Sequence, residues 1–277
     1  MLISIIVPVL NSADTLEQCI RSVTSQSYTD KELIVLDGGS TDGSIALIEA
    51  NADKIAYWRS EPDRGVYDAF NKGIRQAKGE WLYFFGADDF LCDPDVLQNA
   101  ARYLQSAGPQ TRIAYGQVAL LGDCDQVMRL LGESWHTASE KFSAFMPISH
   151  QGVFHRRSLF EENGLFDTSF RFAGDYELLL REIGKQPPLF IPETIIAMHR
   201  SGGLSGSPKN ESRVLWELRR AQKSHGIVFP RPAWLVRLLA AWVHRALRLI
   251  LGQKAGTALT DGLRRLAGKK SHWSRIR

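Results

Sequence analysis

Residues 1–90 alternate between short apolar runs and segments with helical periodicity, and this alternation restricts the fold more than any other feature. Apolar, β-branched or aromatic runs occur at 3–9, 32–37, 55–60 and 80–86. Between them, apolar residues recur at helical spacing, as in "ADTLEQCIRSVTSQ". Strands that alternate with helices predict an α/β fold with a mostly parallel sheet covered by helices on both faces.

Beyond the fourth predicted strand the pattern becomes less regular. The spacing of apolar residues predicts helices over 94–105 and 174–184 and a strand over 112–122. Residues 123–146 lack a clear period and are expected to be rich in loops, whereas 150–167 combine a short strand with a short helix. The chain has no internal repeat, so a repeat architecture is not indicated.

Acidic residues stand where two of the predicted strands end. Asp37 closes the run "ELIVLD", and Asp88 and Asp89 follow the aromatic run "WLYFFGADD". Ligands of parallel sheets bind outside the carboxyl ends of the strands, and carboxylate oxygens suit Mg²⁺ and Mn²⁺. The pair therefore indicates a divalent-metal site. A turn and capping role suits this pair equally well, because Asp is common in turns, and Asp37 taken alone is more often a turn former than a ligand.

A further acid, Asp175, begins the predicted helix 174–184. Taken alone, such an acid is more often an ordinary first-turn residue, which the helix dipole favours, than a general base. No Ser/His or Cys/His pairing suggests a covalent nucleophile. The segment "PVLNSADTLEQ" after the first strand lacks the G-x-G-x-x-G pattern, which argues against a dinucleotide-binding dehydrogenase.

Composition and cysteine spacing indicate an intracellular globular protein. With 44% hydrophobic and 23% charged residues, the chain is able to bury a sizeable core. Cys19, Cys92 and Cys124 show neither paired nor metal-ligand spacing, so we expect a reducing compartment and no disulfide framework. The apolar N-terminal run lacks the basic flank and cleavage site of a signal peptide, and we expect it to be the first strand.

Charge is distributed unevenly along the chain. Residues 231–277 hold eleven Lys or Arg and one acid, Asp261, which gives a net charge of +10 against +4 for the whole chain. Within 234–251, helical spacing separates a basic face from an apolar face. The basic face consists of Arg237, His244, Arg245 and Arg248, and the apolar face of Leu235, Leu238, Leu239, Trp242, Ala246, Leu249 and Ile250.

This amphipathic pattern favours a membrane surface as the partner of the tail. Arginines within the segment make a membrane span costly, whereas a helix lying in the interface keeps them beside anionic headgroups. A nucleic-acid arm is less favoured, because leucines and the tryptophans Trp234 and Trp242 interleave with the charges. A helix that packs on its own domain or on a second subunit is the other alternative.

Four segments in order carry a family resemblance. They are "SIIVPVLN", "ELIVLDGGSTDGS", "SEPDRGVYDAFNKGIRQAKGEWLYFFGADD" and "FAGDYELLLR". In this order and spacing the chain resembles the inverting nucleotide-sugar glycosyltransferases of family 2, which have the GT-A fold, and among them the bacterial exopolysaccharide, lipopolysaccharide and colanic-acid enzymes. The resemblance covers roughly 1–205, which implies a catalytic domain followed by a basic, amphipathic helical extension over 206–277.

The resemblance implies a role for each residue at the strand ends. Pro8 and Asn11 would lie under the nucleotide base, and Asp37 would accept a hydrogen bond from N3–H of the base. Asp88 would face the ribose or the sugar, and Asp89 would bind the metal ion. All five would therefore contribute to donor binding.

Two further positions match parts of the family pattern. Asp175 matches the catalytic base of the Glu-Asp motif, although Gly174 stands where the family has glutamate. The segment "MHRSGGLSG" resembles the loop that closes over the diphosphate, and its His199 would complete the metal shell.

The implied activity is a metal-dependent, inverting transfer of a hexosyltransferase type. The donor would be a nucleoside-diphosphate sugar, UDP-linked by family majority, and the cofactor Mn²⁺ or Mg²⁺. The acceptor would be a hydroxyl of a glycan or of a lipid-linked acceptor in bacterial surface polysaccharide synthesis, and no nucleic acid is expected as a partner.

With a membrane surface bound through 234–277, the expected location is cytoplasmic, peripheral on the inner face of the cytoplasmic membrane. The alternative function is an inactive sugar-nucleotide-binding or membrane scaffold. The joint presence of Asp37, Asp88, Asp89 and Asp175 argues against this alternative, because a scaffold has no need of a catalytic base.

Overall fold

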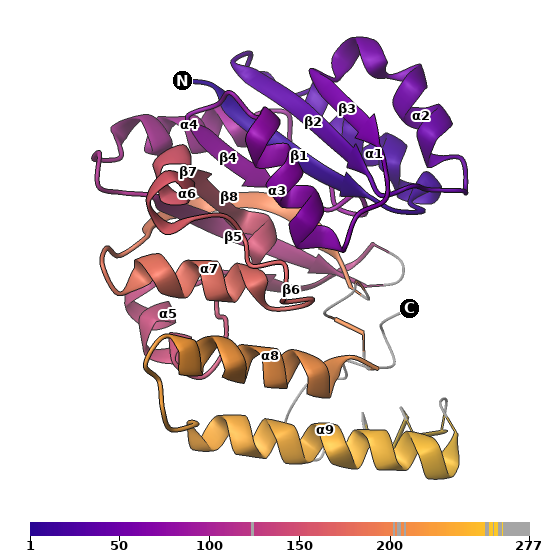
Figure 1. The fold of residues 1–277 in the computed structure, drawn as a ribbon, viewed down its shortest axis with the longest axis vertical. Helices are drawn as coiled ribbons and strands as arrows, with labels where there is room; N and C mark the ends of the chain where they lie inside the picture. The colour runs from indigo at the N-terminus through magenta and orange to yellow at the C-terminus, as the bar shows by residue number, and fades with distance from the viewer. Residues whose placement is uncertain are drawn as a thin grey trace.

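A computed structural model describes most of the chain, in the ranges 1–122, 125–201, 203, 206–207, 209–252, 255–256, 258–259 and 262. The described residues form one eight-stranded sheet with helices around it (Figure 1). Cys124, Asp261 and 263–277 of the basic tail lie outside the described residues.

Parallel strands form the N-terminal half of the sheet, in the order β3-β2-β1-β4. These strands are β1 (Ile3–Val9), β2 (Lys31–Asp37), β3 (Tyr57–Ser60) and β4 (Trp81–Phe84). Neighbours pair in parallel register, with Val9 opposite Asp37, so the carboxyl ends of β1 and β2 meet at one edge. The parallel sheet predicted from the strand-helix alternation is confirmed.

Mixed pairing extends the sheet beyond β4. There β7 (Val153–Arg156) is antiparallel to both β4 and β5 (Ile113–Leu121). β5 also pairs with β6 (Val127–Leu131) in antiparallel and with β8 (Leu189–Arg200) in parallel orientation. The long strand β8 thus runs beside β5 and carries its C-terminal end toward the end of β4.

The expectation that 123–146 are rich in loops is wrong for the described part of that range. It contains β6 and the helix α5 (Trp135–Phe142). The residues of β6 are mostly exposed, because the strand pairs only at the edge of the sheet, so its sequence lacks the apolar alternation of a half-buried strand.

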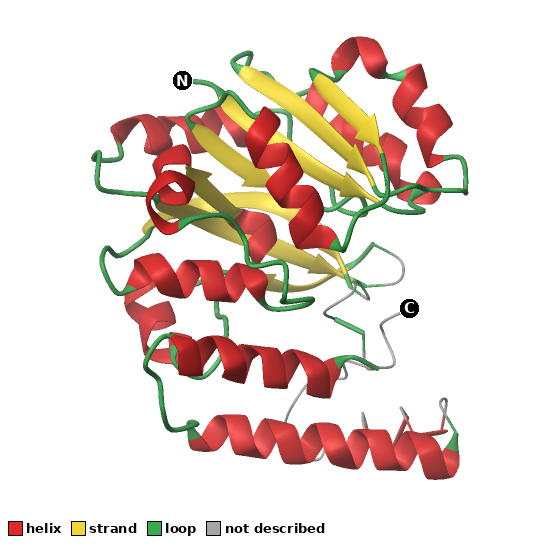
Figure 2. Cartoon of the chain, viewed as in Figure 1, coloured by secondary structure: helices red, strands yellow, loops and turns green. Residues whose placement is uncertain are grey.

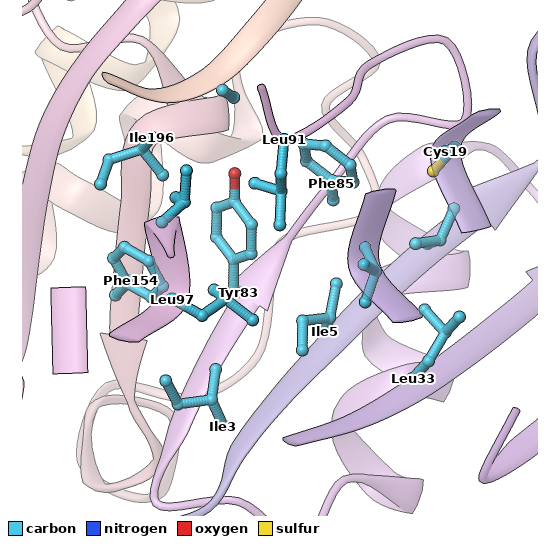
Figure 3. Close-up of a cluster of buried hydrophobic side chains, with 14 of the residues drawn as sticks. Ile3, Ile5, Cys19, Leu33, Tyr83, Phe85, Leu91, Leu97, Phe154 and Ile196 are labelled. Atoms are coloured by element: carbon cyan, nitrogen blue, oxygen red, sulfur yellow. The ribbon is translucent and has the colours of Figure 1, made fainter. Parts of the chain in front are cut away.

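Helices cover both faces of the sheet, as Figure 2 shows. One face is covered by α1 (Ala13–Thr24), α2 (Ser44–Ala50) and α4 (Val96–Ser106), with a short 3-10 turn at Ala52–Lys54. Because side chains alternate along a strand, Ile3, Ile5, Leu33 and Tyr83 all point toward this layer. Figure 3 shows these side chains packed with Cys19 of α1 and Leu97 of α4.

The opposite face is covered by a second group of helices. These are α3 (Val66–Gln76), α5, α6 (Arg157–Asn163) and α7 (Gly174–Ile183), and the 3-10 turn His150–Gly152 lies close by. The alternate residues of the strands, including Ile6 and Phe84, point toward this layer. The predicted cover of helices on both faces is therefore confirmed.

Two C-terminal helices complete this second layer. α8 (Glu211–Ser224) packs on α7, and α9 (Pro232–Leu251) packs on α8, so that α9 is the outermost element in Figure 1. Trp234 and Ala241 of α9 are buried in the same apolar cluster as α3 and α7. No helix among the described residues combines the length and the apolar character that a membrane crossing requires.

α3 approaches β1 closely at Gly73. A Cβ atom at this position would lie 2.4 Å from Cγ2 of Ile6 and 3.3 Å from Cδ2 of Leu36. The absence of a side chain therefore sets the distance between α3, which carries Tyr67, and the strands whose ends form the candidate site.

We expect Gly73→Ala to lower the free energy of unfolding by about 1–3 kcal/mol, the usual cost of overpacking a core, although alanine favours helix formation. Gly184→Ala is the matched control, because its Cβ would meet nothing within 4 Å, and we expect it to change stability by less than about 1 kcal/mol. Urea denaturation measures both. If Gly73→Ala is as stable as the wild type, then Ile6 and Leu36 can shift to accept the methyl group, and our expectation is wrong.

Candidate active site

A cavity of about 420 Å³ lies at the carboxyl ends of β1 and β4. It is lined by residues from both halves of the sheet and from the helices of the second layer. The lining includes Pro8, Asp88, Asp89, His150, Asp175 and His199. The structure thus brings six side chains together from segments far apart in the sequence, including five of the predicted site residues.

Asp37 and Asn11, the other two predicted site residues, organise the loops beside this cavity. Asp37 Oδ2 accepts hydrogen bonds from the backbone N–H groups of Gly39 and Ser40, at 3.0 Å each, and from the Ser60 hydroxyl at 2.6 Å. Asp37 Oδ1 accepts a bond from the Ser40 hydroxyl at 2.5 Å. Burial alone would raise the pKa of Asp37, but these bonds lower it, so the carboxylate stays charged.

Ser40 joins the loop after β2 to the loop after β1. Its hydroxyl oxygen accepts a bond from the N–H of Asn11 at 2.8 Å, and Oδ1 of Asn11 accepts one from Thr41 N–H at 2.9 Å. Asn11 has φ 49°, a left-handed conformation that asparagine tolerates better than most residues. The turn-forming interpretation of Asp37 therefore holds structurally, and it leaves a fixed, negatively charged rim at the ends of β1 and β2.

The two adjacent carboxylates of Asp88 and Asp89 converge above Gly86. A Cβ atom on Gly86 would lie 2.6 Å from Asp89 Oδ2 and 2.7 Å from Asp88 Oδ1, so a side chain there would displace both carboxylates. Burial raises the pKa of Asp88, and the charge of Asp89 raises it further. The pair is thus an electrostatically costly arrangement that a cation would stabilise.

The end of β8 supplies part of that compensation. An isolated bridge pairs Phe90 with Met198, which places the next two residues of β8 against the acidic pair. Nδ1 of His199 lies 2.8 Å from Asp89 Oδ1, and Arg200 donates to the carbonyl oxygen of Asp88 at 2.8 Å. Burial alone would lower the pKa of His199, but Asp89 and Asp88 raise it above its ordinary value.

One buried carboxylate oxygen remains without a partner, which fits a metal ligand. Asp89 Oδ2 is buried and has no hydrogen-bond partner among the described residues, whereas buried polar atoms are normally paired. Among the described residues, no three His, Cys, Asp or Glu side chains lie close enough together to hold a metal ion by themselves. Mg²⁺ commonly takes only one or two protein carboxylates, with the remaining ligands from phosphates and water.

Asp175 is held in the first turn of α7, on the other side of the cavity. Its Oδ1 accepts hydrogen bonds from the Tyr67 hydroxyl at 3.1 Å and from the Tyr176 N–H at 2.8 Å. Burial raises the pKa of Tyr67, and Asp175 raises it further, so Tyr67 stays protonated as a donor. A Cβ at Gly174 would lie 2.9 Å from the Tyr67 ring, so a glutamate before Asp175 would require this ring to shift.

Glu177, the other acid in this turn, is engaged elsewhere. It is buried, forms an ion pair with Arg181, and lies 2.9 Å from Nε2 of His225. It is absent from the residues that line the cavity, so Asp175 is the acid of α7 that reaches it.

His150 lines the cavity but had no role in the sequence interpretation. Its ring packs on Phe84, with ring centroids 5.8 Å apart and an interplanar angle of 20°. Both ring nitrogens are buried and have no hydrogen-bond partner among the described residues. Burial lowers the pKa of His150, against the opposing effect of Asp175 and Asp89, so the imidazole is neutral at pH 7. In the sequence, the only indication of a role for His150 is that it directly precedes a short predicted strand in "HQGVF".

The segment "MHRSGGLSG" reaches the cavity as well. Ser201, Gly203 and Gly206 belong to its lining, while Gly202, Leu204 and Ser205 lie outside the described residues.

Comparison with known proteins assigns the family. The family model described as "Glycosyl transferase family 2" matches residues 4–159. An "Uncharacterized glycosyltransferase" of Mycobacterium tuberculosis is 32% identical over 225 residues, which are 80% of this chain and 84% of that protein. A "PGL/p-HBAD biosynthesis glycosyltransferase" of Mycobacterium bovis is 32% identical over 212 residues, covering 74% and 79%. The chain therefore belongs to glycosyltransferase family 2.

Solved structures agree with the fold expected from this family. TarS of S. aureus (residues 1–349), in complex with UDP-GlcNAc, gives a TM-score of 0.64 at 15% identity and covers 96% of this chain and 85% of that chain. The mannosyltransferase PcManGT from Pyrobaculum calidifontis, in complex with GDP-Man and Mn²⁺, gives 0.63 at 19% identity, covering 96% and 76%. The predicted GT-A fold is confirmed.

Proposed function

We propose that the protein is an inverting glycosyltransferase that moves a sugar from a nucleoside-diphosphate sugar to an acceptor hydroxyl. The supporting observation is the placement of the Asp88-Asp89 pair and Asp175 on the lining of one cavity. Leaving-group stabilisation and proton removal need separate groups on opposite sides of the sugar. An inactive scaffold would have no need of Asp175, which two hydrogen bonds hold at the cavity.

Asp89 and His199 would hold a divalent cation, Mn²⁺ or Mg²⁺, with Asp88 beside them facing the ribose or the sugar. Such a cation neutralises the charge that gathers on a diphosphate leaving group. The unpartnered Oδ2 of Asp89 supports this assignment. The bond between His199 Nδ1 and Asp89 leaves Nε2 of the imidazole as its possible ligand atom.

Asp37, Asn11 and Pro8 would bind the nucleoside. Asp37 is charged and fixed by its own loop, so it offers a rigid acceptor for an N3–H of uracil. TarS was solved with UDP-GlcNAc and PcManGT with GDP-Man. Because these neighbours take different bases, our proposal of UDP rests on Asp37 and on the family majority.

Asp175 would accept the proton of the attacking hydroxyl. The Tyr67 hydroxyl and the Tyr176 N–H hold one of its carboxylate oxygens, Oδ1, which fixes the direction of the other. Attack from the side opposite the diphosphate in a single displacement inverts the anomeric configuration. Consistent with this, the sequence shows no Ser/His or Cys/His pair that would serve as a covalent nucleophile.

We expect UDP to bind more tightly with Mn²⁺ than in EDTA by at least about tenfold, or about 1.4 kcal/mol, and Asp89→Ala to abolish the difference. The exposed Asp53, which does not line the cavity, provides the control variant Asp53→Ala. Titration calorimetry measures each case. If the wild type binds UDP equally well in EDTA and in Mn²⁺, the proposed metal site is wrong.

We expect Asp175→Asn to lower turnover by roughly 10²–10⁴-fold, the usual contribution of a general base, while UDP binding stays at the wild-type level. The amide has the shape of the carboxylate but cannot accept the proton. The comparison variant is Glu177→Gln, which should retain turnover because Glu177 does not line the cavity. Release of nucleoside diphosphate measures the rate. If Glu177→Gln loses activity while Asp175→Asn retains it, Glu177 and not Asp175 is the general base.

We further propose that α9 rests on the inner face of the cytoplasmic membrane, where a lipid-linked acceptor for bacterial glycan synthesis would be present. α9 packs on α8 through Trp234 and Ala241, and its apolar stripe faces outward. The stripe consists of Leu235, Leu239, Trp242, Leu249 and Ile250, each at least 48% exposed. Since α9 contains no acid, a second copy on this stripe would bring like charges together, whereas an anionic surface would attract them.

We expect the double variant Leu239→Ser, Trp242→Ser to bind anionic vesicles about tenfold more weakly per side chain, because burying one large apolar side chain contributes about 1.5–3 kcal/mol. Leu130→Ser is the control, since Leu130 is 49% exposed on β6, away from α9. Cosedimentation with vesicles measures the affinity. A wild-type protein that ignores vesicles, or forms a dimer that the double variant breaks, would contradict the membrane proposal.

A further inference from the structure

A second cavity, of about 320 Å³, lies between the N-terminal turn of α8 and the C-terminal half of α9. Its lining is strongly basic. The polar side chains around it are Lys209, Glu211, Ser212, Arg213, Arg245 and Arg248. Among the residues that the structure describes, four cations and one carboxylate therefore line this cavity.

That carboxylate can balance at most one of the four positive charges. Glu211 Oε2 lies 3.4 Å from Nδ1 of His244, which turns it toward α9. Lys209, Arg213 and Arg245 form no ion pair within the part of the chain that the structure describes, and all three are exposed. The described lining of the cavity therefore carries a net positive charge.

The geometry of the two helices favours an anion with several oxygen atoms. α8 is fourteen residues long and begins at Glu211, so the positive end of its dipole faces the cavity. Arginine guanidinium groups from both helices present planar forks that match the oxygens of a phosphate, and the Ser212 hydroxyl adds a neutral donor. A phosphate fits this donor set better than a single carboxylate.

The position of the cavity indicates where such a phosphate would come from. Leu249 belongs to the lining and is also 78% exposed on the apolar stripe of α9. Arg245 lies one helical turn before it. An anion held here would therefore lie at the margin of a surface that enters the acyl region of a membrane, which is the depth of lipid headgroups.

We propose that this cavity binds the phosphate of an anionic membrane lipid. This inference rests on the proposed docking of α9 on a membrane. It adds a defined site for one lipid headgroup, which docking by charge alone does not need. The segment that follows β8 links the two sites: Gly203 and Gly206 line the catalytic cavity and Lys209 lines this one. A lipid phosphate bound here would thus fix the catalytic cavity next to the membrane surface.

The test compares two double variants that each remove two positive charges from α8, α9 or the residues that flank them. Arg213→Gln with Arg245→Gln alters the cavity, and Lys223→Gln with Arg231→Gln removes exposed charges near the opposite ends of the two helices. Charge attraction alone contributes roughly fivefold per residue near an anionic surface, so non-specific docking would weaken both double variants alike, by up to roughly thirtyfold.

Vesicles of phosphatidylcholine are used, made equally negative with either phosphatidylglycerol or oleate. With phosphatidylglycerol, we expect the cavity variant to bind at least about tenfold more weakly than the control variant; with oleate, which has no phosphate, we expect the two to bind equally. Equal weakening of both variants on phosphatidylglycerol would overturn the proposal. UDP binding by each variant verifies that the fold is retained.

A membrane-free arm separates failure of the cavity from failure of the docking proposal. Dihexanoyl phosphatidylglycerol, used below its micelle concentration, should bind the wild type in calorimetry and lose binding in the cavity variant, whether or not the protein binds vesicles. Inorganic phosphate is the competing probe. If it binds as tightly as the short-chain lipid, the cavity is a free-anion site and the lipid assignment is wrong.

Discussion

The placement of two adjacent carboxylates at the end of β4 is the constraint on which the rest of the site depends. Asp89 is buried and Asp88 is half-buried beside it, and their mutual repulsion is costly unless cations or hydrogen bonds compensate. The bridge between Phe90 and Met198 ties the end of β8 to this turn and thereby supplies His199 and Arg200. The mixed half of the sheet, through β8, thus supplies groups that compensate the charge of the acidic turn after β4.

The sequence was sufficient for those parts of the molecule that depend on local pattern. The period of apolar residues located β1 to β4 and their helices, and the strand ends identified Asp37 and the acidic pair. β6 and β8 were not predicted, since an exposed edge strand has no buried alternation and β8 is paired with β5 across a long stretch of chain. Pairing of this kind is decided by tertiary contacts, which leave little trace in a short window of sequence.

The site residues that the sequence did not reveal are those defined by their neighbours in space. The Tyr67 hydroxyl donates a hydrogen bond to Asp175 from a helix more than a hundred positions earlier in the chain. The Tyr67 ring also occupies the volume that a side chain at residue 174 would need. The departure from the family pattern at Gly174 is therefore matched by the position of the Tyr67 ring. His150 is similar: α3 and β4 enclose its ring, so that the imidazole is neutral and has no hydrogen-bond partner among the described residues.

The orientation of α9 reconciles two interpretations of its sequence, as a membrane-binding helix and as a helix that packs on its own domain. His244 faces Glu211 of α8, and the guanidinium of Arg237 lies 5.0 Å from the ring centre of Phe145, so much of the basic face is turned toward the domain. The apolar stripe is thereby left outward. A helix can pack on its own domain and still offer a surface to lipid, because the two contacts use different faces. On the proposed docking, the stripe makes the contact and the arginines act from its margin.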